Sequence, residues 1–111
     1  MTITGQNIGY IRVSTTDQNT SRQLDNNIEL HRTFIDKCSG KDTHRPELNT
    51  MLEFVRDGDC VYIHSMDRLA RNLLDLKNIV LNLTQKGVKV IFVKKNLSFN
   101  ILIFLVGHVL I

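Results

Sequence analysis

A serine and an arginine stand two positions apart at the end of the first apolar run of the sequence. This run, residues 8–13, reads IGYIRV, and Ser14 follows it directly. Alternate residues of a strand point to the same face, so we expect Arg12 and Ser14 to project to one side. A hydroxyl beside a guanidinium can meet a phosphate, because arginine presents a planar fork of donors to its oxygens. A helix-capping serine beside a surface arginine would explain the same residues.

A second arginine closes the polar loop 39–45, which reads SGKDTHR. Arg45 is followed by Pro46, a residue that suits the first turn of a helix. The beginning of a helix favours anions, so Arg45 stands where a phosphate could bind. A solvated loop is the simpler interpretation of this segment taken alone.

The third segment is residues 66–71, which read MDRLAR. If it is helical, Arg68 and Arg71 share a face, and Asp67 pairs with Arg71 at a spacing of four residues. Two arginines converging beside the end of a strand could clamp a phosphoryl group. A surface salt bridge would account for the pattern with no function.

Apolar runs and helix signals alternate along the chain, and they must position these three segments. We expect an α/β fold of three layers, α/β/α, with a mainly parallel sheet of four to five strands covered by helices. In open sheets of this kind, functional residues gather where strands end and helices begin. The expected strands are 8–13, 33–38, 60–65 and 88–93, and the expected helices are about 17–30, from Pro46 to Gly58, and from Asn72 to Gly87.

Length and charge are compatible with one small domain and leave the ligand class open. The chain has 111 residues and a formal net charge of +3. Residues 76–111 contain five lysines and no acid, a distribution that would suit a phosphate backbone. A solvated lysine-rich face would explain the asymmetry as well. These lysines are Lys77, Lys86, Lys89, Lys94 and Lys95.

The two cysteines and the chain ends indicate a reducing compartment. Cys38 and Cys60 lie in or beside expected strands, without CxxC or Cys/His spacing, so we expect buried free thiols. The first ten residues lack a basic stretch followed by an apolar one, so no signal peptide is expected. The apolar run 101–111 is too short to cross a bilayer as a helix.

Taken together, the three segments resemble a known family. The runs YIRVST, DKCSGKDTHRPEL and DRLARNL, in this order and spacing, are similar to the catalytic-domain signature of serine site-specific recombinases of the resolvase/invertase type. The resemblance extends over residues 8–99. It implies that Ser14 is the nucleophile, and that Asp67 orients the arginines or assists proton transfer. It implies that the scissile phosphate is held by Arg12, Arg45, Arg68 and Arg71, and that the site is shaped by Tyr10, Gln18, Gln23 and Ser39.

The implied reaction is cleavage and rejoining of DNA strands through a phosphoserine intermediate. Because the phosphodiester energy stays in the covalent linkage, rejoining needs no ATP. Four guanidiniums could stabilise the charge that develops on the phosphate oxygens, so we expect no metal and no cofactor. The resemblance further implies double-stranded DNA as partner, a homodimer or tetramer for the complete family member, no small-molecule ligand and no membrane. It also implies a location in the bacterial cytoplasm, associated with the nucleoid.

The end of the sequence departs from the family pattern. Related recombinases continue past a segment like NLSF into a long dimer-forming helix and a helix-turn-helix domain. Here we expect a catalytic domain at 1–99, an aberrant apolar tail at 100–111, and no helix-turn-helix domain. DNA binding by this chain alone should then be weak, unselective and salt-sensitive. Ser65 is a smaller departure, because many relatives carry lysine there.

Two other classes of function remain open from the sequence. A shortened recombinase could be a non-catalytic remnant, or a pairing partner of a full-length recombinase. The same layered fold also carries flavodoxin-like and receiver-like domains. Those would need a glycine-rich phosphate loop or an acidic pocket after the first strand, and the run at 14–21, STTDQNTS, has neither.

Overall fold

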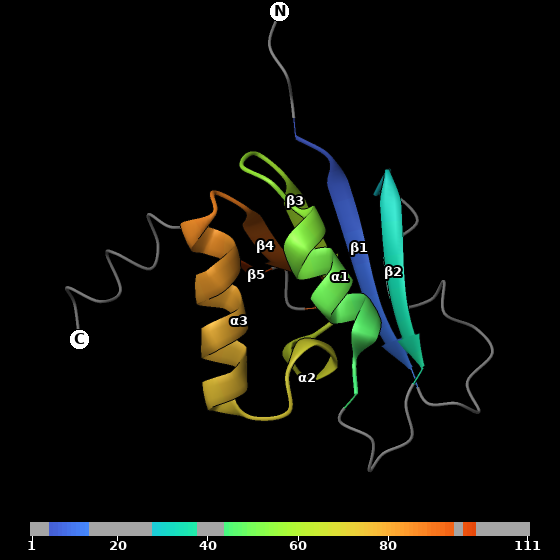
Figure 1. The fold of residues 1–111 in the computed structure, drawn as a ribbon, viewed down its shortest axis with the longest axis vertical. Helices are drawn as coiled ribbons and strands as arrows, with labels where there is room; N and C mark the ends of the chain where they lie inside the picture. The colour runs from blue at the N-terminus through green and yellow to red at the C-terminus, as the bar shows by residue number, and fades with distance from the viewer. Residues whose placement is uncertain (1–4, 14–27, 38–43, 95–96, 100–111) are drawn as a thin grey trace, which may run out of the picture.

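Five strands form one sheet in the computed structural model, which describes residues 5–13, 28–37, 44–94 and 97–99. The order of the strands is β2-β1-β3-β4-β5, and β1 to β4 are parallel whereas β5 runs antiparallel to β4 (Figure 1). The strands are β1 (Asn7–Val13), β2 (Arg32–Lys37), β3 (Cys60–Ile63), β4 (Lys89–Phe92) and β5 (Leu97–Phe99).

Three helices of the described ranges accompany the sheet, and the two longer ones lie in front of it in Figure 1. They are α1 (Pro46–Phe54), α2 (Met66–Leu69) and α3 (Leu73–Gln85). Pro46 opens α1, as expected, because its fixed φ suits the first helical turn. The side chain of Asn72 caps α3 by accepting the amide of Asp75 at 2.8 Å. Beyond α3, Gly87 adopts a φ of 83°, which few residues other than glycine tolerate.

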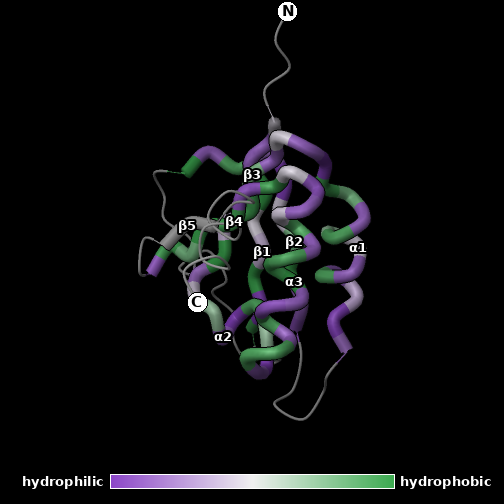
Figure 2. Tube along the Cα trace, turned by 90° about the vertical axis from the view of Figure 1, so that its left-hand side faces the viewer, coloured by the Kyte–Doolittle hydropathy of each residue, from purple (hydrophilic) through white to green (hydrophobic). Residues whose placement is uncertain are grey.

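The core lies between the sheet and the two longer helices. Even-numbered positions of β1 face it, because successive strand residues alternate between faces. Hydrophobic and hydrophilic stretches alternate along α1 in Figure 2, as expected for a helix with one buried face. The opposite face of the sheet carries a smaller cluster formed by Ile11 and Val13 with Leu30, Tyr62 and Val93. The main core comprises Ile8, Tyr10, Phe34, Leu48, Met51, Val55, Val61, Ile63, Leu69, Ala70, Ile79, Val80, Leu83, Val88, Val90 and Phe92.

The α/β class and the mainly parallel sheet are confirmed, and so are all four expected strands. The helix expected at about 17–30 lies mostly outside the described residues, and its expected last turn is wrong, because residues 28–30 are not helical. The first described helix ends at Phe54, earlier than expected, because Val55 is already extended. No helix in the described ranges is long and apolar enough to cross a membrane.

Candidate active site

Two arginines join the end of β1 to the start of α2. Arg12 Nη2 donates to the main-chain oxygen of Asp67 at 2.5 Å, and Arg68 Nη1 donates to the main-chain oxygen of Arg12 at 3.2 Å. Arg12 has the same strand parity as Tyr10, so it points to the face that carries the helices. The crossed bonds place two guanidiniums at the edge where the parallel strands end, which is where open α/β sheets usually carry their ligands.

Asp67 stands beside these arginines with its side chain 78% exposed. Its Oδ1 accepts the hydroxyl of Ser65 at 2.5 Å, and its Oδ2 lies 4.0 Å from Arg68 Nε. The Ser65 hydrogen bond, helped by a backbone amide and by the charges of Arg68 and Lys94, outweighs partial burial and lowers the pKa of Asp67. Asp67 is therefore a carboxylate at neutral pH. This state suits orientation of arginines better than donation of a proton.

Arg45 reaches the same edge from the beginning of α1. It is the N-cap residue of that helix, and its side chain is only 10% exposed. Nη1 donates to the main-chain oxygen of Leu69, and Nη2 forms a 2.9 Å ion pair with Asp75 Oδ2. These two bonds hold the Arg45 side chain against the turn between α2 and α3.

Arg71 is placed differently from the sequence expectation. Helix α2 ends at Leu69, and the C-cap Ala70 is extended, so Arg68 and Arg71 do not share a helical face. The expected pairing of Asp67 with Arg71 is also wrong, since the Asp67 carboxylate is bonded to Ser65 instead. The side chain of Arg71 is exposed, and its amide donates to Asp75 Oδ2 at 3.2 Å. A helix of four residues is too short to create the spacing that the pattern assumed.

Asp36 is a supporting residue that sequence reasoning missed. It is buried on β2, accepts the hydroxyl of Tyr10 at 2.8 Å, and accepts the amides of Glu47 and Leu48, both at 2.9 Å. The N-cap Arg45 makes no side-chain cap bond, so Asp36 caps α1 from the neighbouring strand. Strand alternation could have revealed it, because an acid on the apolar face of a strand needs hydrogen-bond partners.

The described part of the candidate site therefore gathers residues from three separate segments. Arg12 is hydrogen-bonded to the main chain of Asp67 and Arg68 to the main chain of Arg12, and Arg45 donates to the main chain of Leu69 in the same short helix. Tyr10 lies behind them, buried and bonded to Asp36. This arrangement of fixed guanidiniums could bind a phosphate group. The positions that fall outside the described residues are Ser14, Gln18, Gln23 and Ser39.

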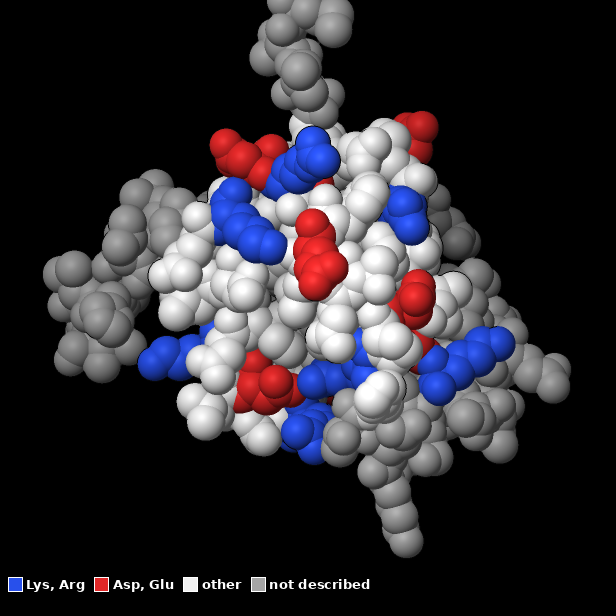
Figure 3. Space-filling view, in the orientation of Figure 1, with Lys and Arg blue, Asp and Glu red and all other residues white. Residues whose placement is uncertain are grey.

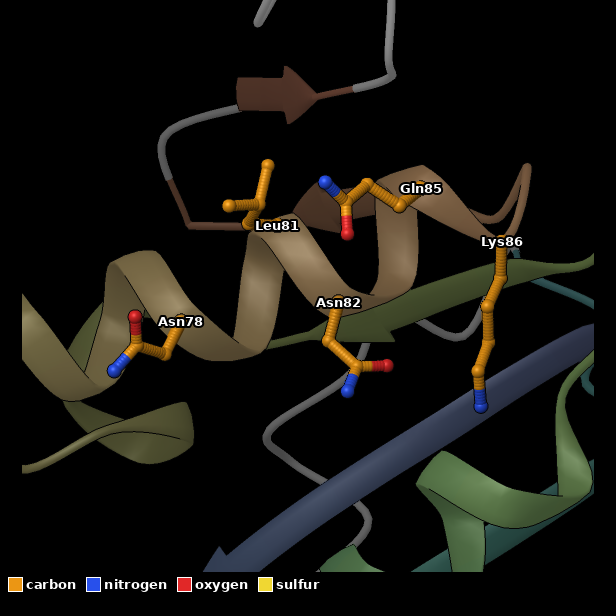
Figure 4. Close-up of a pocket in the computed structure, with 5 residues that line it drawn as sticks. All are labelled: Asn78, Leu81, Asn82, Gln85 and Lys86. Atoms are coloured by element: carbon orange, nitrogen blue, oxygen red, sulfur yellow. The ribbon is translucent and has the colours of Figure 1, made fainter.

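Two surface hollows lie on or near α3. A groove of about 230 Å³ between α2 and α3 is lined by Asp67 and Arg71 together with five other residues. A larger hollow, of about 410 Å³, lies along α3 and the residue that follows it (Figure 4), and its lining contains no acid and none of the candidate site residues. Its residues are Asn78, Leu81, Asn82, Gln85 and Lys86. Only the groove between α2 and α3 belongs to the candidate site.

Charge does not form one continuous basic patch on the face that Figure 3 displays. Among the residues coloured there, acidic side chains stand between basic ones. The two described ion pairs, Arg45 with Asp75 and Arg68 with Asp67, belong to the candidate site. A phosphate would therefore meet individually positioned arginines rather than a broad positive surface.

The sequence and the fold both match known proteins. The model of the family "Resolvase, N terminal domain" matches residues 7–102. The chain is similar to the Transposon Tn21 resolvase of Escherichia coli, with 60% identity over 97 residues, and the match covers 87% of this chain and 52% of that protein. The chain thus spans about half the length of the curated relatives it matches.

Solved structures give the same result for the fold. The catalytic domain of ISC1926 TnpA, an IS607-like serine recombinase, aligns with a TM-score of 0.61 and 25% identity, covering 78% of this chain and 67% of that one. A resolvase family site-specific recombinase from Streptococcus pneumoniae aligns with a TM-score of 0.65 and 22% identity, covering 95% of this chain and 85% of that one. The second alignment bears on the fold alone.

Proposed function

Since this chain belongs to the resolvase family of serine recombinases, through the N-terminal domain of that family, we propose that it performs the DNA-cleaving step of site-specific recombination. The observation that carries the proposal is the convergence of Arg12, Arg45 and Arg68 from three segments at the carboxyl edge of the sheet. Ser14 follows the last residue of β1 in sequence, so the proposed nucleophile is attached to the strand that bears Arg12.

In the proposed reaction, the Ser14 hydroxyl oxygen attacks the phosphorus of a DNA phosphodiester. A phosphoserine ester forms, the bond from phosphorus to one sugar oxygen breaks, and the released sugar oxygen takes up a proton while Ser14 loses one. The reverse attack by a sugar hydroxyl rejoins a strand, and it needs no ATP because the number of phosphoester bonds is unchanged.

The arginines would act on the phosphate oxygens. Negative charge develops there as phosphorus is attacked, and donors already held in position stabilise it without reorganisation. Arg12 and Arg68 are each tied to a main-chain carbonyl, and Arg45 is tied to a carbonyl and a carboxylate. Asp67 is ionised and contacts Arg68, so we assign it an orienting role. Arg71 is exposed beside the groove and would reach the phosphate from the rim.

The finer parts of the proposal concern partners. We propose double-stranded DNA inside the bacterial cell, near the nucleoid, as the substrate. We also propose that the acting unit is a homodimer or tetramer, because two strands must be cut and exchanged together. The Transposon Tn21 resolvase is about twice as long as the stretch matched here, so its remaining half offers a way to supply DNA binding in a test.

The test is a search for a covalent protein–DNA adduct. The chain is fused, after Phe99, to the remaining part of the Tn21 resolvase, and is incubated with that protein's recombination site carrying a nick beside the scissile bond. We expect an adduct that survives a denaturing gel and maps to Ser14 by mass spectrometry. Ser14→Ala should remove it entirely, because no oxygen is left to bond to phosphorus.

Ser65→Ala in the same fusion is the matched control, since it removes a hydroxyl near the site without removing the nucleophile. An adduct on any other residue, or equal adduct in Ser14→Ala, would contradict the assignment. Failure of the wild-type fusion to form adduct, while Tn21 resolvase itself does so, would instead support a non-catalytic chain.

A further inference from the structure

One carboxylate oxygen joins two of the proposed phosphate-binding segments. Asp75 Oδ2 accepts Arg45 Nη2 at 2.9 Å and the amide of Arg71 at 3.2 Å. Arg45 and Asp75 are 30 positions apart in sequence, and their side chains are 10% and 26% exposed. A pair this sheltered is less screened by solvent than an ordinary surface ion pair.

Helix capping explains only part of this arrangement. Asp75 is the third residue of α3 after the N-cap Asn72, and an acid there commonly reaches back to a free amide at the start of its own helix. Its bond to the Arg71 amide, in the turn just before Asn72, serves that purpose. The bond to Arg45 does not, because Arg45 belongs to the beginning of a different helix.

The contact with Asp75 limits how the Arg45 guanidinium can turn. Nη1 is held by the Leu69 carbonyl and Nη2 by Asp75, so both ends of the planar group are fixed. The remaining N–H groups keep a constant direction for another acceptor. If only the Leu69 bond remained, the guanidinium could rotate about it. Arg45 would then have to be ordered at the moment a phosphate binds.

We infer that Asp75 is a positioning residue that fixes the Arg45 guanidinium for the phosphate and couples it to the Arg71 turn. The inference deepens the proposed function and rests on it for the identity of the phosphate. Asp75 does not touch the reacting atoms in this scheme. It acts through Arg45, and its negative charge also offsets the repulsion among the clustered arginines.

The test uses three variants. Asp75→Asn keeps an oxygen that can accept the Arg71 amide but removes the charge that holds Arg45. Asp75→Glu restores the charge. Asn72→Ala is the matched control, because it removes the cap of the same helix turn and leaves the Arg45 ion pair intact.

The first measurement is made on the 111-residue chain itself. NMR spectra of the arginine side chains report how fast each guanidinium rotates. We expect slow rotation for Arg45 in wild type and in Asn72→Ala, fast rotation in Asp75→Asn, and partial recovery in Asp75→Glu. Unchanged Arg45 signals in Asp75→Asn would overturn the inference.

The second measurement is the rate of Ser14 adduct formation in the fusion protein at saturating DNA. We expect Asp75→Asn to slow it by roughly tenfold to a hundredfold, as for a small misplacement of a catalytic group, and Asn72→Ala to slow it much less. If Asp75→Asn and Asn72→Ala slowed adduct formation equally, Asp75 would act only as a helix cap. If wild type forms no adduct, the proposed function fails, whereas the NMR comparison still decides whether Asp75 holds Arg45.

Discussion

At the edge where the parallel strands begin, a buried aspartate is fully engaged with the backbone. Asp59 is 8% exposed, and its two oxygens accept the amides of Gln6 and Arg56, both at 2.9 Å. At the opposite edge, arginine side chains from three segments donate to main-chain carbonyls, and Arg45 also donates to the carboxylate of Asp75. The first edge uses a charge to stabilise the fold, and the second is the edge at which we propose that a phosphate binds.

The two edges differ in the side chain that carries the charge, which is a carboxylate at the first edge and a guanidinium at the second. A carboxylate bonded to two amides is satisfied and leaves nothing for a ligand. An arginine bonded to one carbonyl keeps further donors, since a guanidinium has more N–H groups than one carbonyl can accept. We therefore expect substitutions at the strand-start edge to change stability, and substitutions at the strand-end edge to change chemistry.

The largest effect should come from the strand-end edge. Arg68→Lys, made in the fusion protein, should slow Ser14 adduct formation by about a hundredfold to a thousandfold, the usual cost of losing one oriented donor to a developing oxyanion. Lysine keeps the charge but cannot bond to the Arg12 carbonyl and present a planar fork together. Unfolding in urea should be little changed.

Arg56→Lys is the matched substitution at the strand-start edge. The side chain of Arg56 is exposed, and the residue contacts Asp59 through its main chain, so adduct formation should stay at the wild-type rate. If Arg56→Lys and Arg68→Lys slowed adduct formation equally, the two edges would not differ in their role in the reaction.

A middle-sized effect should appear at the strand-start edge. Asp59→Asn replaces one acceptor oxygen by an NH₂ group, which leaves the amide of Gln6 or Arg56 without its partner. We expect the free energy of unfolding to fall by about 1–3 kcal/mol, measured by urea denaturation. Asp57→Asn, at an exposed acid of the same turn, should cost less than about 0.5 kcal/mol. A stability of Asp59→Asn equal to wild type would show that this edge is not held by its carboxylate.

The smallest expected effect is on the stability of the folded protein at acidic pH. Burial alone would raise the pKa of Asp75, but hydrogen bonds from Arg71 and Arg45 and the charges of both hold it below the ordinary value of 3.8. The unfolded chain then binds the proton more readily, so this stabilisation is complete above pH 3.8 and is lost as the pH falls through the folded-state pKa.

Asp75→Asn should therefore flatten the acid end of the stability curve by at most about 1 kcal/mol. Denaturation in urea at a series of pH values measures the difference, with Asp57→Asn as the control. If wild type and Asp75→Asn lose stability in parallel below pH 3.8, the Arg45 ion pair contributes nothing to folding.

Much of the fold could be predicted because strand signals are local. Each expected strand is a short apolar run between turn residues, and all four were found. A fifth strand was allowed by the expected four to five, but its position was not, since three residues that pair with β4 carry too little pattern of their own. The last turn of the helix expected at 17–30 was wrong, because helix ends are set by caps and packing more than by composition.

The residues of the candidate site could be selected from the sequence, whereas their contacts could not. Arg12, Arg45, Asp67 and Arg68 were selected because their segments together resemble the family signature, since each segment taken alone has a simpler interpretation. Their partners could not be foreseen. Asp75 reaches across to Arg45, and nothing in the sequence next to Asp75 indicates that contact. Strand alternation indicates that Asp36 needs hydrogen-bond partners, but not that amides at the start of α1 supply them.

By itself, the sequence determined the chemistry that is available: a serine after an apolar run, arginines at three strand ends, and an alternation of elements that brings strand ends to one edge. Only the tertiary structure decided how those groups are held. In the structure, α2 ends at Leu69, so Arg71 does not share a helical face with Arg68, and Arg45 forms an ion pair with Asp75. The physical reason is range. Propensity and alternation act between neighbours in sequence, whereas a hydrogen bond between residues 30 or 56 positions apart exists only once the sheet has brought them together.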